Sequence, residues 1–245
     1  MSAPVRIVGT PVSPFVRKVL VFLRLKNVPF EIDPLIPFFA NDDYARLNPL
    51  RRIPLLIDDR VTLADSSVIC QYLEDRYPQP ALYPADVALR ARARWLEEYS
   101  DTHMRDVILV SLFFEIATKP FIWGVEPDAN VVARARDVQL PKILDYLESQ
   151  VPEDGFMCGD FSIADIAIAA PFRNLKWSRI QVDADRWPRT SRFIERAFAH
   201  PGFADLAPIE KAVARTAVPE QRAVLEQLGW KVMAENFSAA KPRGL

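Results

Sequence analysis

The sequence is poor in the residues that form disulfides and metal sites, with two cysteines and two histidines among 245 residues. Cys70 and Cys158 lie far apart in the chain, and neither belongs to a CxxC motif. A disulfide framework needs several paired cysteines, and a zinc site needs closely spaced cysteine or histidine ligands. We therefore expect no disulfide and no metal, and we interpret both cysteines as small apolar residues of the core.

Two further absences limit the kind of partner. The 31 basic residues nearly balance the 32 acidic ones, so no strong field favours nucleic acid or an anionic membrane. No basic and apolar leader opens the chain, and no apolar run approaches the roughly 20 residues that span a bilayer. The sequence therefore predicts a cytoplasmic protein that binds neither nucleic acid nor membrane. Because half of its residues are apolar, it can bury one large core or two small ones.

The pattern of the chain changes near residue 78. Before this point helical patterns alternate with short β-type runs, at Val5–Val8, Phe30–Ile32, Leu55–Ile57 and Val61–Leu63. After it the patterns are helical throughout, and a linker with three prolines separates the two parts at Tyr77–Asp86. The sequence predicts a small α/β domain over residues 1–80 and an all-helical domain over residues 87–245.

Several helices can be placed by their periodicity and their ends. The first carries an apolar stripe at helical spacing, which leaves its basic residues to face water; the stripe is Val16, Val19, Leu20 and Leu23, and the basic residues are Arg17, Lys18 and Arg24. In the helical part, a long helix is expected from Val87 to Thr118, where Lys119-Pro120 ends it. Ser162 and Asp165 form a capping box that opens another helix, and Pro171 predicts that this helix bends or ends early.

Three short motifs stand out in the first domain: Ser13-Pro14-Phe15-Val16-Arg17-Lys18-Val19, Arg52-Ile53-Pro54-Leu55-Leu56 and Ala64-Asp65-Ser66-Ser67-Val68-Ile69. The first places a hydroxyl at the start of a helix, the second a proline in a strand, and the third an acid and a serine at the start of another helix. Helix N-termini carry free amide donors and a partial positive charge. Two of the three motifs could therefore bind an anionic ligand.

In this order and spacing the motifs resemble the glutathione-binding half of the cytosolic glutathione transferases. The linker phrase Ala81-Leu82-Tyr83-Pro84 and the box from Gly159 to Ile166 also resemble motifs of that family, so the resemblance covers nearly the whole chain. It implies a thioredoxin-like N-terminal domain, an all-α C-terminal domain and a homodimer. It also implies a serine-type, bacterial-like enzyme of detoxification, in which the thiolate of the cosubstrate glutathione attacks a small hydrophobic electrophile.

By this resemblance, Ser13 activates the thiol of glutathione. A cysteine-type thiol has a pKa of about 8.5 and is mostly protonated at neutral pH. A hydroxyl donor and the positive end of the first helix would both stabilise the thiolate. From the residues alone, Ser13 can also be a plain N-cap of the helix that begins at Pro14.

The second motif would hold the cysteinyl and glycyl parts of glutathione. The resemblance implies that Pro54 is a cis-proline and that the Ile53 backbone pairs with the ligand like an added strand. Arg52 would pair with the glycine carboxylate, with Arg51 as the less favoured alternative. The residues alone leave open an ordinary strand that ends at a trans-proline, and arginines that are simply exposed.

The third motif would hold the γ-glutamyl end of glutathione. Asp65 would take the α-ammonium group, while the amide and hydroxyl of Ser66 would take the α-carboxylate. Many members of the family carry glutamate where this chain has Asp65, so the shorter side chain would need a water or a partner-subunit residue to reach. The alternative is that Asp65 and Ser66 form only a helix cap.

The last part of the predicted site is the pocket for the electrophile. The resemblance places it between a loop of the first domain and the middle of the long helix, at Pro11, Val12, His103, Asp106, Val107 and Val110. A lone histidine on a helix, such as His103, is more often a structural residue than an acid or base. Other chemistries also use this fold, so a glutathione-dependent lyase, dehalogenase or isomerase, or a non-catalytic binding or regulatory protein, stays open. The Ser-Ser-Cys motif of zeta-type isomerases is absent.

Overall fold

A computed structural model describes residues 4–244. The chain forms two compact units: one combines the chain up to Pro80 with the chain from Pro201 onward, and the other is Ala81–His200. The division after Pro80 falls within the predicted linker. Residues 201–244, which the sequence led us to place in the helical domain, pack instead with the first unit.

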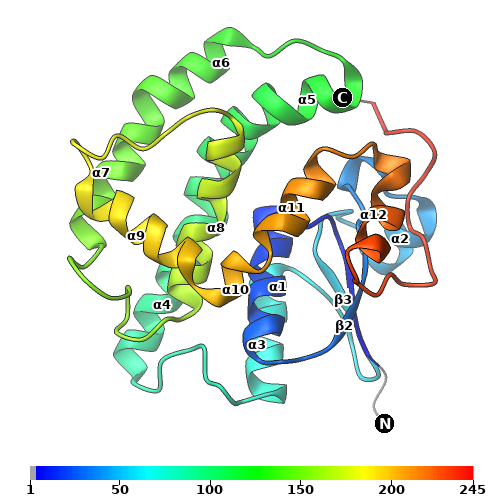
Figure 1. The fold of residues 1–245 in the computed structure, drawn as a ribbon, viewed down its shortest axis with the longest axis horizontal. Coiled ribbons are helices and arrows are strands. Elements are labelled where there is room, and N and C mark those ends of the chain that lie inside the picture. The colour runs from blue at the N-terminus through cyan, green and yellow to red at the C-terminus, as the bar shows by residue number, and fades with distance from the viewer. Residues whose placement is uncertain (1–3, 245) are drawn as a thin grey trace. The chain divides into compact units, whose positions relative to one another are not determined.

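The first unit is built around a four-stranded sheet with the strand order β2-β1-β3-β4 (Figure 1). Its strands are β1 (Val5–Val8), β2 (Phe30–Asp33), β3 (Leu55–Ile57) and β4 (Thr62–Ala64). β1 runs parallel to β2, whereas β3 runs antiparallel to both β1 and β4. Val8 pairs with Leu55, so the residues that follow β1 lie beside those that precede β3. This register brings the first two predicted motifs together.

The helices of the first unit are α1 (Pro14–Leu25), α2 (Asp42–Leu47), α3 (Ser66–Arg76), α10 (Pro201–Ala204), α11 (Ala207–Ala214) and α12 (Gln221–Gln227), with single 3-10 turns at Pro37–Phe39 and Val218–Glu220. The apolar stripe of α1 is buried, as predicted. The expectation that Arg17 and Lys18 face water is wrong, since both are fully buried. The physical reason is that α1 packs against α3 and α10, which cover the flanks of the helix.

The second unit is helical, with α4 (Val87–Tyr99), α5 (Lys119–Trp123), α6 (Ala129–Arg134), α7 (Leu140–Gln150), α8 (Ile163–Trp177) and α9 (Pro188–Ala199). A π-helical segment, η2 (Ser100–Thr118), joins α4 to α5, and a π-helical turn, η3 (Ala135–Gln139), joins α6 to α7. The long helix therefore does not end at Lys119-Pro120 as expected. Pro120 falls in the first turn of α5, where a missing amide breaks no bond within that helix. The helix ends instead at Gly124, which is left-handed with φ of 66°.

The start of α8 confirms the predicted capping box. The amide and the hydroxyl of Ser162 both donate to Asp165 Oδ2, over 2.9 and 3.0 Å, and the Met157 amide donates to Oδ1 over 2.8 Å. α8 continues through Pro171 to Trp177, so the early end that we considered does not occur. Cys70 and Cys158 are both buried, in agreement with their interpretation as core residues. Among the described helices, none combines the length and the apolar character needed to cross a bilayer.

Candidate functional site

The loop that follows β1 is fixed by backbone hydrogen bonds before it reaches Ser13. The amide of Gly9 donates to the Asp33 carbonyl and the amide of Thr10 to the Leu35 carbonyl, both over 2.8 Å. The Ser13 amide then donates to the Thr10 carbonyl over 3.0 Å. The position of Ser13 is therefore set by the sheet and by the segment after β2.

Ser13 is the N-cap of α1, with extended backbone angles, and Pro14 follows as the first helical residue. Its Oγ accepts a hydrogen bond from the Val16 amide over 3.5 Å, at the long limit for such a bond. The cap uses the oxygen only as an acceptor. Because a hydroxyl is also a donor, the hydrogen of Ser13 stays available to a ligand, so capping and a chemical role are compatible in this geometry.

Ile53 and Pro54 lie beside this loop, and the peptide bond between them is cis, as predicted. Gly9 approaches the Ile53 side chain closely: a Cβ atom at Gly9 would lie 3.1 Å from Ile53 Cβ. Within the described residues, no loop or turn hydrogen bond is found to the Ile53 amide or carbonyl. These two groups are therefore open to pairing with an extended ligand.

The two arginines before Ile53 differ in what they contact. Arg51 donates to the Ala40 carbonyl over 3.1 Å and to Asp42 over 3.0 Å. The Arg52 side chain is exposed and has no ion-pair partner among the residues that the structure describes. The Arg52 carbonyl, in contrast, is held by the Tyr44 hydroxyl and by the Asn48 side-chain amide, the latter over 2.7 Å. The backbone is thus fixed, while the Arg52 guanidinium is free to meet a carboxylate.

Asp65 and Ser66 open α3. Asp65 is the N-cap, and its Oδ1 accepts from the amides of Ser67 and Val68 over 2.9 and 3.2 Å. Its backbone has φ of 76° and ψ of 126°, a conformation that is rare for a residue other than glycine. Such outliers gather at functional sites because other interactions must hold them. The cap uses one carboxylate oxygen and leaves the second open.

Ser66 is buried, with 4% of its surface exposed, and its hydroxyl makes no hydrogen bond among the described residues. A cation lies at the same helix end: the buried Lys18 ammonium donates to Ser67 Oγ over 3.1 Å. The helix dipole and this lysine both add positive potential at the N-terminus of α3. The site therefore suits a carboxylate.

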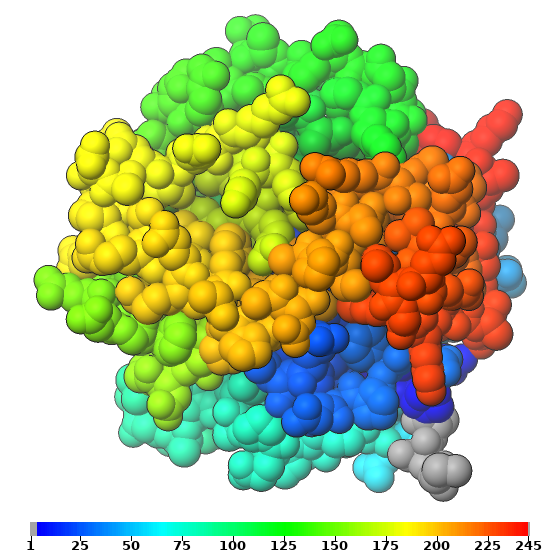
Figure 2. All heavy atoms as spheres, viewed as in Figure 1, coloured from blue at the N-terminus to red at the C-terminus, as the bar shows by residue number. Residues whose placement is uncertain are grey.

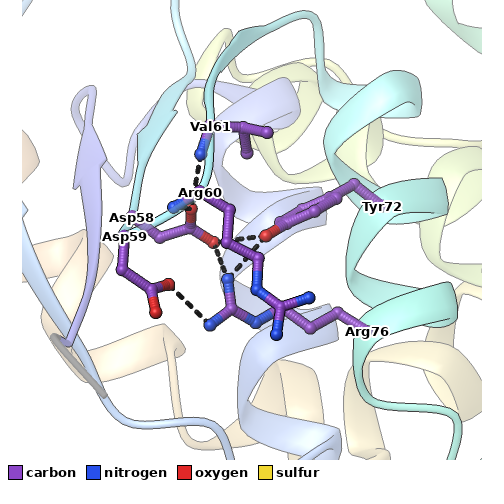
Figure 3. A network of polar contacts seen from close by, with 6 residues as sticks. All are labelled: Asp58, Asp59, Arg60, Val61, Tyr72 and Arg76. Carbon is purple, nitrogen blue, oxygen red and sulfur yellow. Dashed lines mark hydrogen bonds and ion pairs between the residues drawn. The ribbon is translucent and has the colours of Figure 1, made fainter.

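A polar network connects the turn between β3 and β4 to α3 (Figure 3). Asp58 accepts from the amides of Arg60 and Val61 over 2.8 and 2.9 Å, and from the Tyr72 hydroxyl over 2.6 Å. Arg76 pairs with Asp58 and, over 2.7 Å, with Asp59. Burial alone would raise the pKa of Asp58, but the hydrogen bonds from Tyr72 and the two amides outweigh it and lower that pKa. The network fixes α3, and with it the cap residues, against the sheet.

The residues predicted for the second substrate fall in both units. Pro11 is buried and Val12 is partly exposed on the loop after β1; the remaining four lie on η2, where Val107 is buried and His103, Asp106 and Val110 are exposed. The His103 ring lies 5.5 Å from the ring of Tyr99, and Asp106 pairs with Arg105. The electrophile pocket stays a prediction.

Sequence reasoning missed three residues that support the site. Lys18 was assigned to solvent, and Tyr44 and Asn48, which hold the Arg52 carbonyl, were not considered. A lysine within a long apolar run is a signal that could have identified Lys18, because such a run predicts burial on most of the helix surface. Tyr44 and Asn48 give no such signal, since they act only through the fold of the loop.

The fold and the site define a protein with a thioredoxin-like domain and a helical domain. The model of the glutathione S-transferase N-terminal domain matches residues 7–81, and that of the C-terminal domain matches residues 109–201. The chain belongs to the glutathione S-transferase family, whose members use glutathione as a cosubstrate.

Individual relatives are similar at a modest level. Glutathione S-transferase 3 of Zea mays is 32% identical over 66% of this chain and 74% of its own length. The maleylacetoacetate isomerase of Pseudomonas aeruginosa is 31% identical over 67% of this chain and 75% of its own. A solved glutathione S-transferase from Rhodospirillum rubrum has a TM-score of 0.76 and 26% identity, covering 82% of this chain and 91% of its own. The family thus includes relatives with different named activities.

Proposed function

We propose that this protein is a glutathione transferase that binds glutathione along the edge formed by the loop after β1, the Ile53–Pro54 turn and the start of α3. The observation that carries the proposal is that three groups with unused hydrogen-bonding capacity lie on these neighbouring elements. They are the Ser13 hydroxyl, the Ile53 backbone and the Ser66 hydroxyl. Donors left free at helix N-termini favour an anionic ligand.

In this proposal, each part of glutathione has its own partner. The α-carboxylate of the γ-glutamyl group binds at the start of α3, where Ser66 and the charge of Lys18 favour it, and the open oxygen of Asp65 takes the ammonium group. The backbone of the cysteinyl residue pairs with Ile53. The glycine carboxylate meets Arg52, which is preferred over Arg51 because Arg51 is already paired with Asp42.

The chemical step follows from the position of Ser13 at the N-terminus of α1. A hydrogen bond from the hydroxyl and the positive end of the helix both favour the thiolate over the thiol. The proton of the thiol passes to solvent, and the thiolate forms a C–S bond with the electrophilic carbon of an apolar substrate. The displaced electron pair leaves with a departing group or moves onto an activated double bond that takes up a proton, while Ser13 stays unmodified. No enzyme thiol takes part.

The similarity to a maleylacetoacetate isomerase makes a glutathione-dependent isomerase the second candidate. In both reactions glutathione must bind at the same place, so the recognition groups do not distinguish them. The lack of the Ser-Ser-Cys motif before the aromatic residue at Phe15 favours the transferase. A non-catalytic binding protein is a weaker candidate, because it would not need a Ser13 hydroxyl hydrogen that is available to the thiol of the ligand.

Isothermal titration with glutathione tests the proposal. Saturable binding is expected in the micromolar to millimolar range, a free energy of roughly −4 to −8 kcal/mol. The double variant Asp65→Ala, Ser66→Ala should lose affinity by more than it loses thermal stability, whereas a matched loss of both would mean that the two residues only cap α3. No heat of binding from the wild type at about ten millimolar ligand would remove the proposal.

We also propose a two-fold symmetric dimer in the cytoplasm, as is usual for this family. Sedimentation at micromolar concentration should give about twice the chain mass of 27.9 kDa. A species of the chain mass alone would contradict this part of the proposal.

A further inference from the structure

The C-terminal segment from Asp205 to Arg243 lies outside both family models, which match residues 7–81 and 109–201. It nevertheless belongs to the same compact unit as the proposed glutathione site. In Figure 1 its red end runs beside α2, and in the space-filling view its orange and red atoms directly border the blue atoms of the N-terminal chain (Figure 2). Its contacts show which parts of the site it reaches.

The first contact reaches the loop that carries Ser13. Glu210 on α11 forms an ion pair with Arg17 on α1, and both side chains are completely buried. Arg17 also donates to the carbonyl of Val12 over 3.2 Å. Val12 is the residue immediately before Ser13. A single buried side chain, that of Arg17, therefore connects Glu210 to the backbone that positions the Ser13 hydroxyl.

The second contact extends the sheet at its edge strand. The amide of Ile32 donates to the Lys231 carbonyl, and the amide of Met233 donates to the Ile32 carbonyl, both over 3.0 Å. The segment thus adds a short parallel bridge to β2, at Val232. An edge strand has open backbone groups, so this pairing ties the segment firmly to the sheet.

The third contact is made by the buried carboxylate of Asp33, at the end of β2. It accepts from the Phe237 amide over 2.9 Å and from the guanidinium of Arg222 over 2.5 Å. The carbonyl of the same residue accepts from the Gly9 amide over 2.8 Å. Asp33 therefore links the C-terminal segment on one side to the loop after β1 on the other.

The fourth contact reaches the Arg52–Pro54 turn. Phe237 is buried, and its ring lies 5.8 Å from the ring of Tyr44, which is fully buried in α2. The Asn41 amide donates to the Phe237 carbonyl over 2.9 Å, and the Ala239 amide donates to the Phe39 carbonyl over 2.7 Å. Tyr44 in turn donates its hydroxyl to the Arg52 carbonyl. The segment thus packs on the residue that fixes the backbone next to Ile53.

We propose that residues 205–243 act as a positioning segment for the glutathione site, with Glu210 setting the Ser13 loop through Arg17 and Phe237 setting the Arg52–Pro54 turn through Tyr44. This inference rests on the proposed function. None of the links requires the segment to touch glutathione. One loop supplies the Ser13 hydroxyl that donates to the thiolate, and the other supplies the Ile53 backbone that pairs with the ligand. Moving either loop therefore changes ligand binding, although the segment itself does not touch the ligand.

Three variants test the turn. Phe237→Ala and Tyr44→Phe should each weaken glutathione binding, by about 2- to 30-fold, because they remove successive links of one chain of contacts. Phe237→Tyr keeps an aromatic ring and should retain most of the affinity. The matched control is Leu225→Ala, which removes a fully buried side chain of the same segment that takes part in none of these links. The control should lose stability but keep its affinity for glutathione.

The link to Ser13 needs a chemical readout, because an ordinary structural defect would not change the ionisation of the bound thiol. Glu210→Gln keeps the size of the side chain and removes the charge that holds Arg17. We expect the pKa of bound glutathione, followed by thiolate absorbance, to shift in this variant and to stay as in the wild type in Leu225→Ala. An unchanged titration in Glu210→Gln would overturn this half of the inference.

Amide hydrogen exchange without ligand separates this inference from the proposed function. In Phe237→Ala, exchange should rise at residues 39–54 and not in the helical unit. The role of the segment would be overturned if Phe237→Ala exchanged amide hydrogens at residues 39–54 as slowly as the wild type does. It would also be overturned if Phe237→Ala and Tyr44→Phe both bound glutathione as tightly as the wild type. Either result would leave the proposed function intact, because the wild type would still bind glutathione. If the wild type does not bind glutathione, the proposed function fails, and this inference about the glutathione site fails with it.

Discussion

Gly9 and Ile53 lie so close together that no residue larger than glycine fits at position 9. A Cβ atom at Gly9 would lie 3.1 Å from Ile53 Cβ and 2.5 Å from Val16 Cγ2. Gly9 also has φ of +148°, a conformation that other residues rarely adopt. The β1 loop, the first turn of α1 and the Ile53–Pro54 turn meet at this point, so the glycine sets how near two parts of the proposed site can lie.

Gly9→Ala should therefore affect both stability and ligand binding. Overpacking and backbone strain are expected to lower the free energy of unfolding by about 1–3 kcal/mol, measured by urea denaturation. Glutathione affinity should fall as well, because Ile53 must move. Gly155→Ala is the control, since Gly155 has φ of +78° but no atom within 4 Å of an added Cβ. Equal affinities in wild type and Gly9→Ala would show that the ligand does not use Ile53.

Ser13→Ala tests the thiolate step. Removing a charge-assisted hydrogen bond costs roughly 1.5–3 kcal/mol, so the pKa of the bound thiol should rise by about one to two units. Glutathione should still bind. Conjugation at neutral pH should fall by roughly ten- to a hundredfold and recover partly as the pH is raised, measured by steady-state kinetics.

The outcome that would contradict this role is a titration of bound thiol that is the same in wild type and Ser13→Ala. Ser13 would then be only the N-cap of α1. Ser13→Cys is a companion test: a cysteine at a helix N-terminus has a lowered pKa and should form a mixed disulfide with glutathione, detectable by mass spectrometry.

Asp165 predicts a pH dependence of stability in the helical unit. Its burial raises the pKa of the carboxyl to about 6, in spite of hydrogen bonds from Met157 and Ser162 that lower it. A folded-state pKa above the unfolded value of 3.8 stabilises the fold at low pH, and this contribution is lost as the pH rises through about 6. Compared with Asp165→Asn, which does not titrate, the wild type should lose relative stability between about pH 4 and pH 7 in urea denaturation. A pH-independent difference between the two proteins would refute the prediction.

His200 should give a pH dependence of stability opposite in sign to that of Asp165. Its ring stacks on Phe161 with the ring centroids 3.7 Å apart, and its buried Nδ1 has no hydrogen-bond partner among the described residues. Burial lowers the pKa of this histidine below its usual 6.5. The unfolded chain therefore binds the proton first, so stability is retained above pH 6.5 and lost as the pH falls through the folded-state pKa. His200→Phe keeps the stacking on Phe161 and has no group that titrates at this position. As the pH is lowered, the midpoint temperature of thermal unfolding should therefore fall less in this variant than in the wild type.

Much of the architecture could be predicted from local patterns. The strands, the N-cap at Ser13 and the capping box of Ser162 and Asp165 depend on residue types a few positions apart, so the sequence alone contains the information. The cis bond at Pro54 was predicted only by family resemblance, since most X-Pro bonds are trans. Pro120 was misjudged, because it falls in the first turn of α5, where its missing amide breaks no hydrogen bond within that helix.

The sequence by itself determined the kind of domain at each end of the linker and the residue types of the proposed glutathione site, because these depend on short periods and short motifs. Only the tertiary structure decided that Arg17 and Lys18 are buried and that Tyr44 holds the Arg52 carbonyl. It also decided that the C-terminal segment packs on the first unit. These features depend on contacts such as that of Arg17 with Glu210, which are 193 positions apart in the chain. No local pattern encodes such a pairing, because burial of a charge becomes favourable only when a distant partner arrives.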